Sequence, residues 1–314
     1  MSQSPAAPAM LDAIVVGAGP AGLTAATYLR RFHRDCLVLD AGDSRARWIP
    51  ESNNCPGFPH GVSGDELLRL MREQARKFGA RFEHAEIDAI RRQNDGFVLS
   101  AGPRQWRAHC VILATGVADT LPEASWTGDA VACGALRLCA VCDAWEATDS
   151  RIGVYGPLAD IAAHGLFLRS YSEHVTLLPT DPGSSPGDGA VEALRQAREA
   201  GVALLPAGGR LEFDGERCSY RGPDGTVATF DSVYPYLGAR TSAGIAAAAG
   251  AELTGDGTLV VDAGQTTSVP GLYAIGDVVS GLNQVSVAVG QAAVAATRVH
   301  ARLPHVPRVG GDAR

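Results

Sequence analysis

The first forty residues alternate short apolar runs with polar turns at the spacing of a strand–helix–strand unit. Residues 11–16 (LDAIVV) form an apolar run of strand length, and the glycine-rich residues 17–22 follow at once. Residues 23–31 carry apolar positions at helical spacing, and residues 36–40 (CLVLD) form a second apolar run. This pattern predicts strand, turn, helix and strand, which is the repeating unit of parallel α/β sheets.

Similar patterns continue along the chain. Residues 65–79 are amphipathic and predict a helix that begins with Asp65 as its N-cap and ends at Gly79. A second strand–turn–helix pattern begins at Arg151, and residues 269–303 predict a strand ending at Asp277, a loop and a long helix. Further strands are expected over residues 82–92, 96–101, 107–116, 174–179, 211–214 and 227–238, and a further helix over residues 190–201.

The first glycine turn has the spacing of a dinucleotide-binding fingerprint. Gly17 permits the tight turn, Gly19 lets the backbone approach a pyrophosphate, and Gly22 lets the helix pack closely on the strand. The helix N-terminus would then direct unpaired N–H groups at the phosphates. Asp40 ends the second strand 18 residues after Gly22, where a carboxylate can accept hydrogen bonds from both adenosine ribose hydroxyls. A glycine-rich turn that binds nothing is the alternative.

Composition narrows the class of protein. The 314 residues include 27 Lys and Arg against 34 Asp and Glu, and the net charge of −7 argues against nucleic-acid binding. Hydrophobic residues make up 46%, which is ample for a packed core, and no apolar stretch approaches the length of a membrane span. The first ten residues do not read as a secretory signal, so we expect a cytoplasmic protein.

Cysteine spacing singles out one pair. The seven cysteines are an odd number without framework spacing, which argues against a secreted disulfide scaffold. Cys139 and Cys142 are separated by two residues, so they can close and reopen a disulfide across one helical turn. The alternatives are a zinc site, which would need distant partners such as Cys133 or His164, and two unpaired buried thiols. Cys36 and Cys110 lie in apolar strands and are expected in the core.

Taken together, four motifs resemble the low-molecular-weight thioredoxin reductases, and their order and separations match from about residue 11 to 303. They are Gly17–Gly22 (GAGPAG), Ala114-Thr115-Gly116, Cys139–Asp143 (CAVCD) and Gly276-Asp277. The resemblance implies an α/β fold with two Rossmann-like nucleotide-binding domains. The FAD domain would be discontinuous, in residues 1–116 and 239–314, with the CxxC domain of residues 117–238 inserted between its segments.

The resemblance also implies roles for individual residues. FAD would be the cofactor, held by Gly17, Gly19, Pro20, Ala21, Gly22, Asp40, Asn54, Thr115, Gly116, Gly276, Asp277, Gln284 and Val285. Within this set, Asp277 would bind the ribityl hydroxyls, Gln284 and Val285 would meet the pyrimidine edge, and Asn54 would lie close to the isoalloxazine. The family usually has Arg-Gln where this chain has Asn283-Gln284. Cys55, beside Asn54, is a further candidate for modulating the flavin.

The catalytic residues implied are Cys139, Cys142 and Asp143. Cys142 would exchange electrons with the flavin, Cys139 would react with the sulfurs of the partner, and Asp143 would move a proton to and from the leaving thiol. No metal is expected. The partner would be a thioredoxin-like protein or a small disulfide or dithiol, and the chain would form a homodimer.

The second glycine turn departs from the family pattern. It reads Gly156-Pro157-Leu158-Ala159-Asp160, so a proline removes an N–H donor and a carboxylate stands where an anion would bind. No Lys or Arg follows the next strand at Pro179-Thr180-Asp181-Pro182. We therefore predict that the electron donor is not NADPH.

In this respect the chain is similar to ferredoxin-linked flavin thioredoxin reductases. An oxygen-coupled dithiol oxidase is the alternative, although Asp143 stands where those oxidases tend to have histidine. A flavoprotein redox sensor without turnover is a further alternative.

Overall fold

The computed structural model describes residues 9–94, 96–181, 188–279, 281–305 and 307. The chain divides into two compact units. The first contains the residues up to Ala46, Asp65–Val117 and the residues from Thr241 onward, and the second contains Arg47–Gly64 and Ala118–Arg240. The chain passes between the units four times, and the strands at the last two crossings, β7 (Val117–Asp119) and β15 (Ala239–Thr241), pair with each other.

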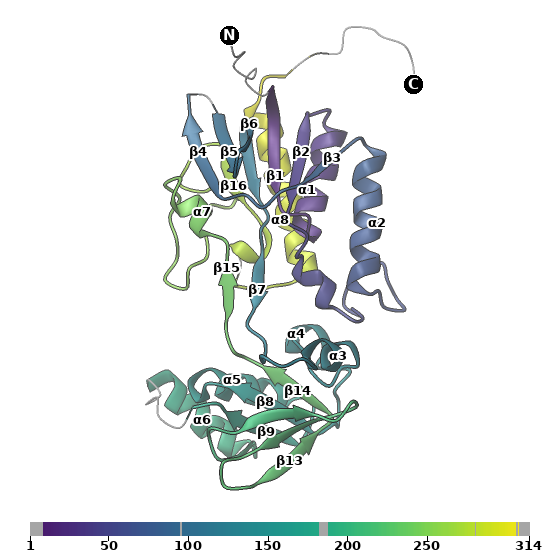
Figure 1. Ribbon diagram of the computed structural model, residues 1–314, viewed down its shortest axis with the longest axis vertical. Helices are drawn as coiled ribbons and strands as arrows, with labels where there is room; N and C mark the ends of the chain where they lie inside the picture. Colours follow the sequence, from purple (N-terminus) through teal and green to yellow (C-terminus); the bar gives the residue numbers. More distant parts are fainter. Residues whose placement is uncertain (1–8, 95, 182–187, 280, 306, 308–314) are drawn as a thin grey trace. The chain divides into compact units, whose positions relative to one another are not determined.

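The first unit is built on a seven-stranded sheet (Figure 1). Its strands are β1 (Met10–Val16), β2 (Cys36–Asp40), β3 (Arg81–His84), β4 (Ala89–Gln93), β5 (Gly96–Ala101), β6 (Arg104–Leu113) and β16 (Leu272–Ala274). The order is β3-β2-β1-β6-β5-β4, and β16 also pairs with β6. The first part of β6 pairs antiparallel with β5, while its last three residues pair parallel with β16. One long strand thus joins a parallel sheet to an antiparallel meander.

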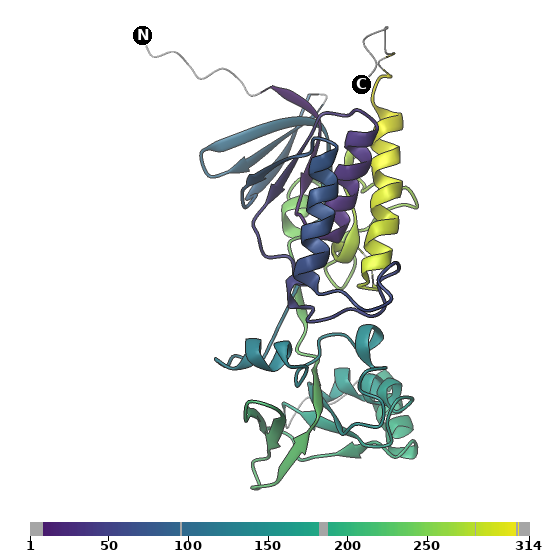
Figure 2. The same cartoon turned by 90° about the vertical axis from the view of Figure 1, so that its right-hand side faces the viewer.

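Both faces of this sheet are buried, which explains the continuous apolar runs in its strands. Ala13 and Val15 of β1 pack on one face, while Ile14 and Val16 pack on the other. Helices α1 (Pro20–Arg31), α2 (Gly64–Lys77) and α8 (Val285–Arg302) run side by side over the first face (Figure 2). Small residues of α8, including Ala292 and Ala295, let α1 and α8 approach closely. The second face is covered by the loops around α7 (Gly244–Ala247).

The second unit repeats the pattern on a smaller scale. Parallel strands β8 (Ile152–Gly156), β9 (Val175–Pro179), β10 (Ala203–Leu204) and β14 (Ser232–Pro235) form a sheet of order β10-β9-β8-β14. Strands β11 (Arg210–Phe213), β12 (Cys218–Arg221) and β13 (Val227–Phe230) form an antiparallel meander. The helices are α3 (Thr127–Ala132), α4 (Ala140–Asp143), α5 (Leu158–Leu168) and α6 (Asp188–Glu199). The predicted α/β class with two Rossmann-like sheets is confirmed.

Several element boundaries differ from the predictions. The last strand ends at Ala274 rather than at Asp277, because Gly276 adopts φ +72° and begins the 3₁₀ turn η2 (Gly276–Val278). The helix predicted from Asp65 begins at Gly64 and so places Asp65 in its first turn. Residues 82–92 and residues 227–238, each expected as one strand, each contain two strands. The strand expected over residues 107–116 ends at Leu113. None of the described helices has the length and apolar character needed to cross a bilayer.

Candidate functional site

The glycine fingerprint forms a tight turn between β1 and α1. Gly17 adopts φ +101°, and a Cβ atom there would lie 2.3 Å from the carbonyl oxygen of Ala114. A Cβ on Gly22 would lie 2.0 Å from the carbonyl oxygen of Gly17, so the helix approaches the turn as closely as its backbone allows. Gly19 is different. A Cβ there would meet only the Ser44 hydroxyl, at 3.3 Å, and this glycine caps α1 with no side-chain hydrogen bond. The backbone at Gly19 therefore has room for a ligand.

The C-terminal segment returns to the same turn. A Cβ on Gly276 would lie 3.1 Å from the Cβ of Ala21, and the Gly276 amide donates a 2.6 Å hydrogen bond to the side-chain oxygen of Gln291 on α8. Asp277 follows in η2 and forms a 3.6 Å ion pair with Arg45. Motifs more than 250 residues apart in sequence thus meet in the first unit.

Two buried polar atoms in this region suit a polar ligand. Thr115 Oγ1 and Asn283 Oδ1 are both buried and have no hydrogen-bond partner among the described residues. Thr115 and Gly116 follow β6, with Gly116 at φ +63°, and Asn283 directly precedes Gln284, the N-cap of α8. Burying a polar atom without a partner costs free energy, so a ligand that supplies hydrogen bonds would stabilise the region. The residues present fit a dinucleotide.

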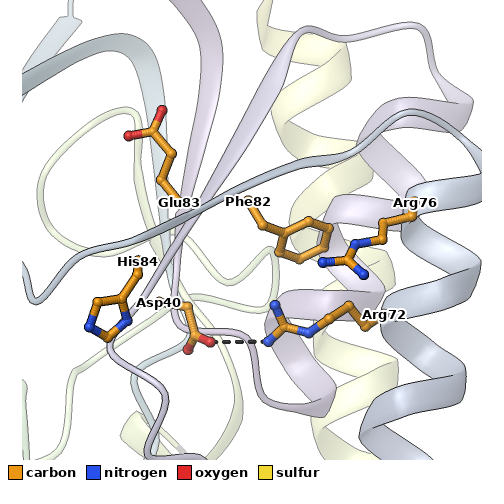
Figure 3. A pocket seen from close by; sticks show the side chains of 6 residues that line it. All are labelled: Asp40, Arg72, Arg76, Phe82, Glu83 and His84. Carbon is orange, nitrogen blue, oxygen red and sulfur yellow. Dashed lines mark hydrogen bonds and ion pairs between the residues drawn. The ribbon is translucent and has the colours of Figure 1, made fainter.

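Asp40 lies at the carboxyl end of β2, beside the glycine turn. One of its carboxylate oxygens accepts a 3.1 Å hydrogen bond from the amide of Ala18. The other pairs with the guanidinium of Arg72 at 3.1 Å (Figure 3). The side chain of Asp40 is 17% exposed. The acidic residue that the fingerprint spacing singles out is therefore connected directly to the turn.

Asn54 and the redox residues belong to the second unit. The side-chain oxygen of Asn54 accepts a 3.1 Å hydrogen bond from Ser52, and the neighbouring Asn53 donates a 2.9 Å hydrogen bond to Glu146. Cys55 is buried, and burial raises the pKa of its thiol. The fingerprint residues, Asp40, Thr115 and Gly276 come together in one unit, while Asn54, Cys139, Cys142 and Asp143 lie in the other.

Cys139 and Cys142 form a disulfide with their Cα atoms 5.2 Å apart. Cys139 is the N-cap of α4, and Cys142 lies within this single helical turn, where its amide donates a 2.9 Å hydrogen bond to the carbonyl of Cys139. The predicted pairing at CxxC spacing is present. The described residues contain no group of three or more His, Cys, Asp and Glu side chains arranged to hold a metal ion.

The carboxylate of Asp143 contacts two side chains, one at each oxygen. The hydroxyl of Tyr234 donates a 2.9 Å hydrogen bond to one carboxylate oxygen, and Arg137 pairs with the other at 3.3 Å. Arg137 is itself fixed by donating a 3.0 Å hydrogen bond to Ser232. Burial raises the pKa of Asp143, whereas Arg137 and Tyr234 act to lower it. The carboxyl group next to the disulfide therefore has a raised pKa and a fixed position.

The second glycine turn keeps only the first glycine of the fingerprint. Pro157 caps α5 and offers no N–H, and Asp160 lies in the first turn of that helix. A Cβ on Gly156 would lie 2.3 Å from the carbonyl oxygen of Tyr236, and the ring of Tyr236 stacks on His164 of α5 at 3.5 Å. Burial lowers the pKa of His164, so this ring favours the neutral state and offers little charge to a phosphate. Pro182, the last residue of the segment expected to lack cations, lies outside the described residues.

The remaining cysteines behave as expected where the structure tests them. Cys36 and Cys110 are fully buried, and burial raises the pKa of their thiols to about 12 and about 11. Both are core residues, as predicted. Cys133 is exposed, and Cys218 is buried in the meander.

Sequence patterns did not reveal the residues that support the site. Arg72 and Tyr234 lie 32 and 91 residues from their carboxylate partners. Arg137 lies in the segment just before the CxxC motif, outside the helices and strands. The only available signal was a buried strand position for Tyr234, which predicts a core residue and gives no reason to expect a polar contact.

Comparison with known proteins identifies the family of the chain. A family model described as pyridine nucleotide-disulphide oxidoreductase matches residues 11–292. Thioredoxin reductase from Aquifex aeolicus is 28% identical over 294 residues, covering 90% of this chain and 89% of that protein. Thioredoxin reductase from Listeria monocytogenes is 26% identical over 292 residues, covering 90% and 91%.

The fold of the chain is similar to that of a solved structure. The crystal structure of thioredoxin reductase from Streptococcus pyogenes matches with a TM-score of 0.83 at 24% identity, covering 94% of this chain and 98% of that one. The two Rossmann-like sheets, the CxxC disulfide and the match over nearly the whole chain agree. The chain belongs to the pyridine nucleotide-disulphide oxidoreductase family and is an FAD-dependent disulfide oxidoreductase of the thioredoxin reductase type.

Proposed function

We propose that this protein exchanges thiols and disulfides through Cys139 and Cys142, with an electron donor other than a nicotinamide nucleotide. The exchange chemistry is supported by the ion pair of Arg137 and the hydrogen bond of Tyr234 with Asp143, one residue after the disulfide. The choice of donor is supported by the second turn, where Pro157 offers no N–H and Asp160 places a carboxylate in the first turn of α5.

The first unit supplies the cofactor site. Gly17, Gly19, Pro20, Ala21 and Gly22 hold the pyrophosphate of FAD at the N-terminus of α1, where N–H groups and the helix dipole favour an anion. When bound, FAD supplies two-electron redox chemistry that side chains lack.

The other assigned residues of the first unit would hold the rest of the cofactor. Asp40 would accept hydrogen bonds from the adenosine ribose, and Asp277 would accept them from the ribityl chain. Thr115, Gly116 and Gly276 would line the backbone approach, and Gln284 and Val285, at the start of α8, would meet the flavin ring.

In the proposed reaction, the reduced cysteine pair passes two electrons to a substrate disulfide. Two electrons and two protons open the Cys139–Cys142 disulfide to two thiols. The thiolate of Cys139 attacks one sulfur of the substrate disulfide, forms a mixed disulfide and releases the other substrate sulfur as a thiolate. Cys142 then attacks the sulfur of Cys139, which restores the enzyme disulfide and releases the second substrate thiol. The substrate gains two electrons and two protons.

Asp143 supplies the proton in this scheme. The leaving thiolate takes a proton from the carboxyl group, which later recovers one from Cys142. Burial raises the pKa of Asp143 and so keeps the acid form available at higher pH than an exposed aspartate would allow. Arg137 and Tyr234 prevent the carboxyl group from turning away.

The proposal for the electron donor rests on the residues of the second turn, which disfavour the phosphates of a nicotinamide nucleotide. Pro157 withholds an N–H, Asp160 places a negative charge in the first turn of α5, and no Lys or Arg occurs between Pro179 and Ala190 to meet a 2′-phosphate. An iron–sulfur protein of the ferredoxin type fits instead, because it needs no nucleotide cradle and delivers the two electrons singly. The acceptor is a thioredoxin-like protein or a small disulfide, and the chain acts as a cytoplasmic homodimer.

Anaerobic titration of the holoenzyme with dithiothreitol tests the exchange pathway. The wild type and the control Cys133→Ser should both lose the visible absorbance of oxidised flavin, because Cys133 lies outside the disulfide. Cys139→Ser and Cys142→Ser should keep it. Asp143→Asn should slow the bleaching by about a hundredfold or more, the usual effect of losing a positioned acid. Bleaching of Cys142→Ser at the wild-type rate would refute the pathway.

Readmission of air then tests the direction. Slow reoxidation is expected of the reductase. Rapid reoxidation with repeated turnover of the dithiol would contradict it in favour of the oxygen-coupled oxidase.

A further inference from the structure

Six residues line a pocket of about 250 Å³ in the first unit. They are Asp40, Arg72, Arg76, Phe82, Glu83 and His84. The pocket lies at the carboxyl ends of β2 and β3, where Asp40 and His84 are register partners, and α2 supplies the two arginines (Figure 3). In open α/β sheets, ligands bind at this edge of the strands.

Two contacts hold the guanidinium of Arg72 in place. Its guanidinium lies 4.9 Å from the centre of the Phe82 ring, and its Nη2 atom is 3.1 Å from Oδ2 of Asp40. Arg76, one turn later on α2, also lies over Phe82, at 5.5 Å. The same ring therefore supports two arginines, and of these Arg72 is the one that pairs with Asp40.

The contacts of Asp40 leave part of its carboxylate available. An ionised carboxylate has about four acceptor positions. One is used by the amide of Ala18 and one by Arg72. The other two acceptor positions match in number the two hydroxyls of a ribose. The hydrogen bonds to Ala18 and Arg72 fix the orientation of the carboxylate and so the direction of these two positions.

Charge gives Arg72 a second role. Asp40 contacts Ala18 in the same turn that is to receive a pyrophosphate, so the carboxylate repels the anion it stands beside. The guanidinium of Arg72, on the far oxygen of the same carboxylate, offsets this repulsion. Because a guanidinium stays charged at all working pH values, the compensation is permanent.

We propose that Arg72 is a positioning residue for the adenosine end of FAD. It holds Asp40 toward the ribose and compensates its charge beside the phosphates. The inference rests on the proposed role of Asp40 as the ribose acceptor, and it extends the site to a helix that the fingerprint does not include.

The test measures FAD release from the holoenzyme. Serial dilution with detection of free-flavin fluorescence gives the dissociation constant of FAD, and added ADP serves as a competitor for the adenosine end. Arg72→Met should raise the dissociation constant about tenfold or more, because a charge-assisted contact is lost. Arg72→Lys, which keeps the charge, should recover part of this loss. Arg69→Met, at an exposed arginine of α2 that pairs with Glu66 and Glu73 outside the pocket, is the matched control and should change the constant less than threefold.

A double-mutant cycle separates this inference from the role of Asp40. If Arg72 acts through Asp40, the variant Asp40→Asn/Arg72→Met should bind FAD about as weakly as the worse single variant. Unchanged or tighter FAD binding by Arg72→Met, or a loss of equal size in Arg69→Met, would overturn the role of Arg72. Unchanged binding by Asp40→Asn would instead refute the ribose contact itself. The dissociation constant of ADP, obtained from its competition with FAD, should rise in Arg72→Met by a factor similar to that of FAD, and an unchanged ADP constant would contradict the inference.

Discussion

The hydroxyl of Tyr234 donates a 2.9 Å hydrogen bond to the carboxylate of Asp143, next to the Cys139–Cys142 disulfide. Tyr234 is fully buried in β14, 91 residues away from Asp143 in sequence. A buried phenol of this kind cannot turn to water, and burial together with the negative charge of Asp143 raises the pKa of Tyr234. The hydroxyl is therefore a permanent donor to the proposed proton carrier.

Replacing Tyr234 should shift the pH dependence of thiol exchange upward. Donation to a carboxylate favours its ionised form, so Tyr234→Phe should raise the pKa of Asp143 further. Because the proposed active form is the protonated acid, the alkaline limb of the exchange rate should move to higher pH. Stopped-flow reduction by dithiothreitol across a pH series measures this limb.

Tyr220→Phe is the matched control for that experiment. Tyr220 is also fully buried, but its hydroxyl donates to the carbonyl of Pro206, at 2.6 Å, away from the disulfide. This variant should lower stability and leave the pH profile in place. An identical shift in both variants would show that Tyr234 acts only through packing.

The two glycines of the first turn should respond differently to alanine. Gly22→Ala places a methyl group 2.0 Å from the carbonyl oxygen of Gly17, so the protein should fold poorly and lose its flavin. Gly19→Ala meets only the flexible Ser44 side chain, at 3.3 Å, and should fold normally. If Gly19 faces the pyrophosphate, its methyl group should nevertheless weaken FAD binding. Thermal unfolding and the flavin-to-protein ratio measure the two effects, and a fully loaded Gly22→Ala protein would contradict the geometry.

His300 makes the stability of the first unit depend on pH. Its Nδ1 atom accepts a 3.1 Å hydrogen bond from the buried Arg34, which requires a neutral ring. Burial first, and then the charge of Arg34, hold the pKa of His300 below its ordinary value of 6.5. A lowered folded pKa means that this stabilisation is complete above pH 6.5 and is lost as the pH falls through the folded value.

Urea unfolding at pH values on both sides of 6.5 measures this loss. We expect the free energy of unfolding to fall on acidification in the wild type and to fall less in His300→Gln. His174→Gln, which changes an exposed histidine of the second unit, should behave as the wild type. A wild-type slope in His300→Gln would assign the acid sensitivity to other groups.

The first strand–turn–helix–strand unit could be predicted from sequence because its signals are local. Strand β2 has the predicted bounds, and Gly17 and Gly22 have the conformation and close contacts that the fingerprint requires. The hairpin strand β12 was missed, because four residues of mixed polarity give little periodic signal. The end of β16 was misplaced because Gly276 leaves the strand through a left-handed conformation.

The supporting residues of the site could not be predicted for a different reason. Arg137 lies before the CxxC motif, Tyr234 lies on a strand of the sheet, and Arg72 lies on a surface helix. Arg72 and Tyr234 are brought to their carboxylates by tertiary packing, and Arg137 pairs with Asp143 across a local segment without regular structure. No spacing rule in the sequence records such pairings. Single-sequence patterns therefore identify the acids and thiols but not the groups that hold them.

The central claim is that this flavoprotein takes electrons from a donor other than a nicotinamide nucleotide. Its most direct test is anaerobic stopped-flow mixing of the oxidised holoenzyme with excess NADPH or NADH, with photoreduced ferredoxin and dithiothreitol in parallel. The flavin should keep its visible absorbance with both nucleotides and lose it with ferredoxin or with the dithiol. Rapid bleaching by NADPH or NADH would show that a nicotinamide nucleotide is a donor, whatever the behaviour of the other donors.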